Sequence, residues 1–160
     1  MGKYTIELPI IETDIDYSTV GKNILFIDAD SPQELKEGLE KIALYFKREF
    51  RYDCTQYSAE AHSNVTKNDS IGLIFYDAAI DETTEAHLGI PLRVLGGGCF
   101  KKIGDCEAWC LDWIWIHPYE RGKGLLSSHW SEIEEQFGKV LFSNPLSKAM
   151  TAFITKQVHI

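Results

Sequence analysis

The sequence lacks any long uninterrupted apolar run. A helix needs about twenty consecutive apolar residues to cross the hydrocarbon core of a bilayer, and no segment of these 160 residues approaches that length. The first residues, Met1 to Pro9, are too poor in apolar side chains, and too acidic downstream, for a secretory signal. We therefore predict a cytoplasmic protein with no membrane partner.

Positive charge is also scarce. The chain has 24 Asp and Glu residues against 16 Lys and Arg, a formal net charge of −8. Proteins that bind nucleic acid neutralise its phosphates with clustered Lys and Arg, so nucleic acid is not expected as the main partner. An acidic surface suits a cationic partner, such as an amine substrate or a basic protein, but it also serves solubility alone. We favour solubility as the role of most of these charges.

Cysteine is sparse and unpaired in pattern. No two of the four cysteines, Cys54, Cys99, Cys106 and Cys110, form a C-x-x-C pair. Adding His117 gives C-x6-C-x3-C-x6-H, which is not a usual zinc spacing. We predict no metal site and buried free thiols.

What the sequence does contain is enough apolar material, 44% of its residues, for one domain spanning residues 1–160. The segment 1–22 alternates weakly and suggests an edge strand. Ser31 is the predicted N-cap of the first helix, with Glu34 completing a capping box. Hydrophobic periodicity predicts strands at 23–28, 71–77, 92–100, 111–116 and 139–143, and helices at 32–50, 58–62, 126–137 and 147–156.

The most informative stretch is 111–130. It opens with an apolar run rich in β-branched and aromatic residues, which Pro118 ends. The turn Arg121-Gly-Lys-Gly124 follows, and after it apolar residues recur at helical spacing, at Leu126, Trp130, Ile133 and Phe137. The order is a buried strand, a glycine-containing turn and an amphipathic helix.

Such a turn has the physical properties of an anion site. The first N–H groups of the helix have no partner within the helix, and the helix dipole adds partial positive charge there. Glycine lets the backbone approach a ligand closely, and Arg121 and Lys123 add cationic charge. The turn is therefore a candidate phosphate site. The alternative is a plain connection between strand and helix that binds nothing.

The segment Trp115-Ile-His-Pro-Tyr-Glu-Arg-Gly-Lys-Gly-Leu-Leu resembles motif A of the GNAT superfamily of acyl-CoA-dependent N-acetyltransferases. In that motif a strand leads into Q/R-x-x-G-x-G/A and a helix. Arg121 fills the first position and Gly124 the fourth, whereas Leu126 stands at the sixth, where Gly or Ala is usual. The resemblance implies a GNAT-like α/β fold. Its mixed, mostly antiparallel sheet would be flanked by helices, and the motif A helix would join a central parallel strand pair.

The resemblance also implies acetyl-CoA as co-substrate. Its pyrophosphate would lie on the N–H groups of Gly122 to Ser127, and its pantetheine arm would pair with the backbone of the preceding strand. The tail from Phe142 resembles the cohesin-acetyltransferase branch, which places Ser143, Asn144 and Ser147 at the border of the site. The predicted cofactor contacts are Ile114, Ile116, Arg121, Gly122, Lys123, Gly124, Leu125, Leu126, Ser127 and Asn144.

Gly104-Asp105 is the strongest turn signal in the chain and predicts a two-residue hairpin loop. In that register Lys102 faces Glu107, Phe100 faces Trp109, and Cys99 faces Cys110. Period-two alternation then places Phe100, Trp109, Leu111, Trp113 and Trp115 on one bulky face. The Gly96–Gly98 run provides either flexibility or room for a ligand.

Asp112 is the unusual residue of its strand. In the predicted register it faces Gly97, among small side chains, and a buried carboxylate needs a partner or a chemical role. One interpretation is a structural ion pair or hydrogen bond. The other is a general base that takes the proton of the acceptor amine, and we assign Asp112 as the catalytic candidate. Glu107 is weaker, because the register already pairs it with Lys102.

We predict an N-acyltransferase that moves an acetyl group from acetyl-CoA to a primary amine. The acceptor is a small amine or a protein, and a homodimer is compatible with the sequence. The last helix of GNAT proteins often carries a Tyr general acid, and Phe153 stands near that place. Two alternatives remain. One is a GNAT-fold acyl-CoA-binding or protein-interaction module without turnover. The other is a phosphate-binding regulatory domain unrelated to acyl-CoA.

Overall fold

The computed structural model describes residues 7–11, 23–64, 69–79, 91–103, 108–143 and 148–158. In this part of the chain six strands form one sheet, with the path β2-β3-β4-β5-β6 and with β1 paired to β4. All pairs are antiparallel except β5 and β6, which run parallel. The strands are β1 Ile10–Ile11, β2 Asn23–Ile27, β3 Ser70–Ala78, β4 Leu92–Lys102, β5 Trp109–Ile116 and β6 Val140–Phe142.

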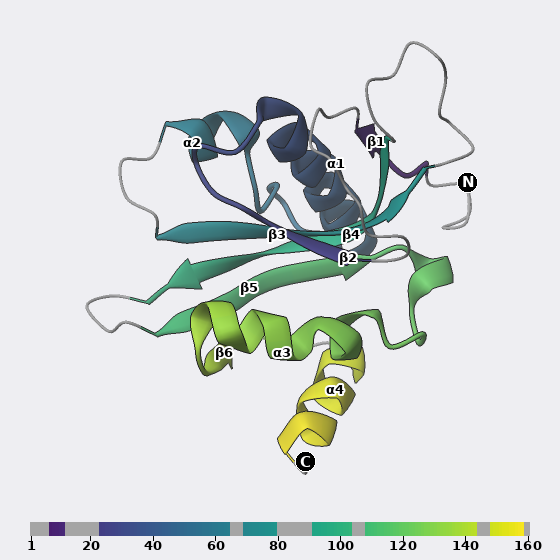
Figure 1. The fold of residues 1–160 in the computed structure, drawn as a ribbon, viewed down its shortest axis with the longest axis vertical. Coiled ribbons are helices and arrows are strands. Elements are labelled where there is room, and N and C mark those ends of the chain that lie inside the picture. The colour runs from purple at the N-terminus through teal and green to yellow at the C-terminus, as the bar shows by residue number, and fades with distance from the viewer. Residues whose placement is uncertain are drawn as a thin grey trace.

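Helices cover both faces of this sheet (Figure 1). One side carries α1 and α2, and the other carries α3 and α4 (Figure 1). A short 3₁₀ turn, Pro118–Glu120, connects β5 to the turn before α3. No helix in the described ranges is long and apolar enough to cross a membrane. The helices are α1 Gln33–Phe50, α2 Ala59–Ser63, α3 Leu125–Phe137 and α4 Lys148–Val158.

The sequence predicted this order of elements correctly. The mixed, mostly antiparallel sheet and the parallel pair β5–β6 joined by α3 confirm the predicted fold class. The apolar stripe of α3 faces the sheet as expected, since Trp130, Ile133 and Phe137 belong to one core cluster with Phe75 and Phe100. A second core cluster lies on the other face, between the sheet and α1.

The predicted register of the β4–β5 hairpin is wrong. Phe100 lies opposite Leu111 and Cys99 lies opposite Trp113, so Asp112 is an extra residue with no partner in the ladder. This is a β-bulge, in which two residues of one strand oppose one of the other. The N–H of Ile103 donates to the carbonyl of Ala108 at 3.0 Å, and the connection beyond them is longer than the predicted two-residue loop. Gly104, Asp105 and Glu107 themselves lie outside the described residues.

The bulge also divides the aromatic face that alternation predicted. Trp113 and Trp115 pack in the cluster beneath α1, whereas Trp109 and Leu111 pack in the cluster beneath α3. One inserted residue reverses the alternation from that point on, because side chains alternate with a period of two. The single bulky face was therefore a wrong prediction.

The glycine run at 96–98 is a packing requirement. A Cβ added at Gly97 would lie 2.7 Å from Leu39 Cδ1 of α1, and one at Gly98 would lie 2.5 Å from the carbonyl oxygen of Trp113. Gly96 is equally crowded by the carbonyl oxygen of Trp115, also at 2.5 Å. The space beside these glycines is filled by β5 and α1, so neither flexibility nor ligand approach accounts for them.

The predicted capping box of the first helix is wrong. Helix α1 begins at Gln33, its N-cap is Pro32, and no side-chain hydrogen bond from the described residues caps it. The hydroxyl of Ser31 instead accepts a hydrogen bond from the N–H of Asp28 at 3.0 Å. Ser31 therefore closes the turn after β2, and its oxygen is not used by the helix.

Candidate functional site

The N-terminus of α3 is open in the structure. Its N-cap is Gly124, with φ 76° and ψ 20°, and no side chain of the described chain caps it. The N–H of Ser128 donates to the carbonyl of Gly124 at 2.8 Å, which closes the first turn. The N–H groups of the first three helical residues, Leu125 to Ser127, precede that bond and have no acceptor within the helix. The first turn contains no acidic residue, so no carboxylate of that turn offsets the positive end of the helix dipole.

Glycine is required at both bends of this turn. Gly122 has a φ of 74° and Gly124 a φ of 76°, values at which a side chain is strained. A Cβ at Gly122 would meet nothing within 4 Å, so the space over the turn is open. The predicted phosphate-binding groups Gly122, Lys123, Gly124 and Ser127 lie together here, and the side chains of Lys123 and Ser127 are exposed.

Leu125 and Leu126 contribute differently. Their side chains are only 6% and 8% exposed and belong to the core cluster beneath α3. A leucine therefore fits at position 126, where the motif usually has a small residue, because its side chain is directed into the core. Only the backbone N–H groups of these two residues are available to a ligand.

Beside this turn, β5 has an edge that β6 does not cover. The β5–β6 ladder ends where Leu111 pairs with Phe142, and the N–H of Ser143 donates to the carbonyl of Leu111 at 3.1 Å. On the other side, the N–H of His117 donates to the carbonyl of Leu95 on β4. Backbone groups alternate in direction along an antiparallel strand, so those of Ile114 and Ile116 point away from β4. Among the described residues no strand pairs with them there.

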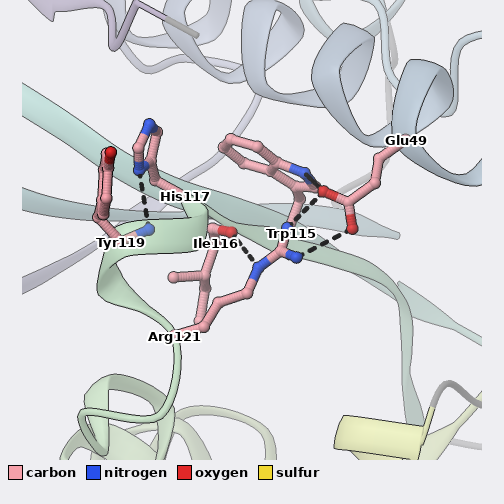
Figure 2. A network of polar contacts seen from close by, with 6 residues as sticks. All are labelled: Glu49, Trp115, Ile116, His117, Tyr119 and Arg121. Carbon is pink, nitrogen blue, oxygen red and sulfur yellow. Dashed lines mark hydrogen bonds and ion pairs between the residues drawn. The ribbon is translucent and has the colours of Figure 1, made fainter. Parts of the chain in front are cut away.

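The guanidinium of Arg121 is paired with a carboxylate of helix α1 in this structure. Its Nη1 and Nη2 donate to the two carboxylate oxygens of Glu49, at 3.0 and 2.6 Å (Figure 2). Its Nε donates to the carbonyl of Ile116 at 2.7 Å (Figure 2). Of the two cationic side chains in the turn, Arg121 is therefore neutralised by Glu49 and Lys123 is not. The backbone of Ile116 was predicted to pair with the pantetheine arm. Its carbonyl already accepts a hydrogen bond from Arg121, so only its N–H group is left for that contact.

Asp112 lies at the point where β5 and β6 part, one residue after the last ladder pair. The sequence placed it among groups that could not balance its charge, and this is wrong: Lys101 Nζ lies 3.2 Å from Asp112 Oδ2. The two form an ion pair, although the geometry is not that of a hydrogen bond, and Oδ2 has no hydrogen-bond partner among the described residues. The same holds for Nε1 of the next residue, Trp113. The ion pair is the arrangement that the structural interpretation expects, and the catalytic role of Asp112 stays a prediction.

Three further predicted positions lie near the C-terminus of the chain. Asn144 and Ser147 lie outside the described residues. Phe153 on α4 packs edge-on against Trp130, with ring centroids 5.0 Å apart. It is partly buried on the core cluster beneath α3, so it acts in packing.

The cysteines are free thiols where the structure describes them. Cys99 is buried, and burial raises the pKa of its thiol to about 11. Cys54 is exposed, so the prediction of buried thiols fails for that residue. Within the described ranges, no group of three or more His, Cys, Asp or Glu side chains is arranged to hold a metal ion.

Two of the contacts above were missed by sequence reasoning. Lys101 received no role from the sequence, because the predicted register paired its neighbour Lys102 with Glu107. Glu49 is 72 positions away from Arg121, and nothing local links them. An acidic residue in the last turn of a helix is unfavourable to the helix dipole, and this was the one available signal that Glu49 serves another purpose.

No protein-family model and no curated sequence matches this chain. Solved structures do resemble it. The acetyltransferase domain of xEco2 has a TM-score of 0.56 at 11% identity, over 93% of this chain and 91% of that one. A ribosomal-protein-alanine N-acetyltransferase from Brucella melitensis biovar Abortus 2308 has a TM-score of 0.52 at 12% identity, over 86% and 90%. An aminoglycoside acetyltransferase from an uncultured soil metagenomic sample has 0.53 at 10%, over 86% and 91%. The chain has the fold of the GNAT acetyltransferases.

Proposed function

We propose that this protein is an N-acetyltransferase that moves the acetyl group of acetyl-CoA to a primary amine. The observation that carries the proposal is the uncapped N-terminus of α3 beside the uncovered edge of β5. The first suits a pyrophosphate, because unpaired N–H groups and the helix dipole both favour an anion. The second suits an extended amide-containing arm, because it offers backbone donors and acceptors in a row.

The residues fit acetyl-CoA in the following way. The pyrophosphate takes the N–H groups from Gly122 to Ser127, and Lys123 adds its charge. The pantetheine arm takes both backbone groups of Ile114 and the N–H of Ile116, since the carbonyl of Ile116 is bonded to Arg121. Asn144, which lies outside the described residues, is proposed as a contact of the arm on the resemblance alone.

The reaction needs no covalent enzyme intermediate. Asp112, or a chain of water molecules, removes a proton from the cationic amine and passes it to solvent. The neutral nitrogen then attacks the carbonyl carbon of the thioester and the C–S bond breaks. The second proton that the nitrogen loses ends on the departing sulfur, so CoA leaves as the thiol. Holding the two reactants together where β5 and β6 part supplies a large share of the rate.

The acceptor class follows from charge and from the neighbours in fold. One neighbour is an aminoglycoside acetyltransferase and another acts on a ribosomal-protein alanine, as their names state. Both acceptors carry amines, and an amine that is cationic in solution is attracted to a chain of net charge −8. The proposed substrate is therefore a cationic primary amine.

A thermal-shift series tests the proposal. Acetyl-CoA and CoA should raise the melting temperature, because a ligand that binds only the native state stabilises it by mass action. ATP and NAD, which share the adenosine diphosphate part, should raise it less. Equal shifts for all four compounds, or none for any, would refute the proposal.

A second candidate is an acyl-CoA-binding module without turnover. It is favoured by one observation, that Phe153 packs against Trp130 where the family often carries a tyrosine acid. The two candidates differ in release of free CoA thiol. A thiol-reactive dye, with acetyl-CoA and a panel of polyamines, aminoglycosides and lysine peptides, should report steady release for the enzyme and none for the module.

A further inference from the structure

Glu49 joins two parts of the molecule that are distant in sequence. It lies in the last turn of α1, and its two oxygens receive three donors: Nη1 and Nη2 of Arg121 and Nε1 of Trp115, the last at 3.1 Å (Figure 2). The side chains of Arg121 and Glu49 are 37% and 27% exposed. A paired fork of this kind fixes direction as well as distance, since the guanidinium is planar and its N–H groups are rigidly arranged.

All three nitrogens of the Arg121 guanidinium donate hydrogen bonds. Besides Nη1 and Nη2, which bond to Glu49, Nε donates to the carbonyl of Ile116. The carbon Cζ lies 5.6 Å from the centre of the Trp115 ring. Trp115 packs in the cluster beneath α1, whereas α3 covers the opposite face of the sheet. The guanidinium is therefore bound to the last turn of α1 and lies next to a ring that packs beneath α1.

Anchoring of Arg121 restricts the backbone of the turn that follows it. Arg121 directly precedes Gly122, and the turn to α3 contains two glycines with positive φ. Neither glycine has a side chain to hold it in place, and glycine has the largest backbone freedom to lose on ordering. An anchor at the first residue of the turn limits that freedom before any ligand arrives, which improves affinity by reducing the ordering cost of binding.

We infer that Glu49 is a positioning residue for the CoA-binding turn, acting through Arg121. Arg121 then serves as the anchor of the turn and does not contact the pyrophosphate. The inference rests on the proposed function for its ligand, and it assigns a task to α1, which otherwise only covers the sheet.

Glu49→Gln is the sharpest test. The amide keeps the shape of the side chain but presents an NH₂ where an oxygen accepted a donor. Arg121→Met keeps the aliphatic stem and removes the fork, and the double variant completes a cycle. Glu37→Gln is the matched control, because it makes the same charge change at an exposed position of the same helix.

Two readouts decide the matter. In the free protein, Glu49→Gln should speed amide hydrogen exchange in peptides covering residues 119–128, and Glu37→Gln should not. By calorimetry, Glu49→Gln and Arg121→Met should each weaken acetyl-CoA binding by about three- to tenfold, with the double variant no worse than either. Neither single variant should reduce the dependence of the dissociation constant on salt, because no phosphate contact is lost.

Opposite results would overturn the inference. Tighter acetyl-CoA binding by Glu49→Gln would mean that a released Arg121 goes to the phosphates. A flatter salt dependence for Arg121→Met would mean that it contacts them already. Unchanged exchange and affinity in Glu49→Gln, with normal binding by the wild type, would refute this inference alone. No binding of acetyl-CoA by the wild type would refute the proposed function with it.

Discussion

Replacement of Gly124 by glutamate separates binding at the α3 N-terminus from folding. A Cβ at this position meets only Ser128 Oγ, at 3.9 Å, so the protein has room for the new side chain. That room lies beside the unpaired N–H groups where the pyrophosphate is proposed. A carboxylate there would occupy the anion site and repel the anion that should enter it.

The cost to stability should be small. Gly124 has φ 76° and ψ 20°, where a residue with a Cβ costs about 1–2 kcal/mol. A negative charge at a helix N-terminus returns about 0.3–1 kcal/mol. The net loss is then about 1 kcal/mol, or roughly 2–4 °C of melting temperature for a chain of this length.

The cost to binding should be much larger. Two like charges about 4 Å apart repel by roughly 4 kcal/mol at an effective dielectric constant of about 20. Even if screening halves this, acetyl-CoA should bind about thirtyfold more weakly. Steric filling of the site adds to the loss.

Gly138→Glu is the control at the other end of the same helix. Gly138 has φ 73° and ψ −147°, a region open almost only to glycine, and a side chain there costs about 1–3 kcal/mol. The control should therefore melt at least as low as Gly124→Glu while binding acetyl-CoA like the wild type. Calorimetry and thermal unfolding on both variants measure the two quantities. Wild-type affinity in Gly124→Glu, or equal loss of affinity in both, would show that the phosphate site is elsewhere.

Two further predictions concern single polar groups. If Asp112 is the base, Asp112→Asn should lower the rate of CoA release by at least about a hundredfold, whereas Lys101→Met should keep most of that rate. If both variants instead keep their turnover and lose a similar small amount of stability, the Asp112–Lys101 ion pair is structural only. Burial lowers the pKa of His62 below its ordinary value of about 6.5, because the ring is desolvated between Tyr57 and Ser70. The unfolded chain then binds the proton more readily, so the free energy of unfolding should fall as pH drops below about 6.5. Urea titrations from pH 7.5 to 5.5 should show a shallower fall in His62→Gln, and an identical fall would exclude His62 as its source.

Much of the fold was open to prediction because its signals are local. The apolar spacing of α3 and the β-branched run of β5 each lie within a dozen residues. The glycine turn between them carries its own chemistry, and both positive φ values fall on its glycines, Gly122 and Gly124. A strand, a turn and a helix in that order, followed by another strand, also require a parallel pair, and the structure has it.

The features that escaped prediction depend on contacts between distant segments. A β-bulge at Asp112 has no turn residue to announce it, and it alone moved Trp113 and Trp115 to the other face of the sheet. The partner of Arg121 lies on α1, so a residue read as a phosphate ligand proved to be bound by Glu49. The predicted register placed Asp112 opposite Gly97, whereas in the structure its ion-pair partner is Lys101.

The bulge itself follows from packing, but packing does not explain why the bulged residue is an aspartate. Leu111 must fill the cluster beneath α3 and Trp113 the cluster beneath α1, which no unbroken alternation allows. One extra residue between them solves that problem whatever its side chain is. A carboxylate is a costly choice, because Oδ2 is buried without a hydrogen bond and unsatisfied buried polar atoms destabilise the folded state. Its ion-pair partner Lys101 is 52% exposed, and exposed pairs contribute little. We therefore propose that the carboxylate serves the reaction at the point where β5 and β6 separate, and we expect Asp112→Asn to cost turnover far more than stability.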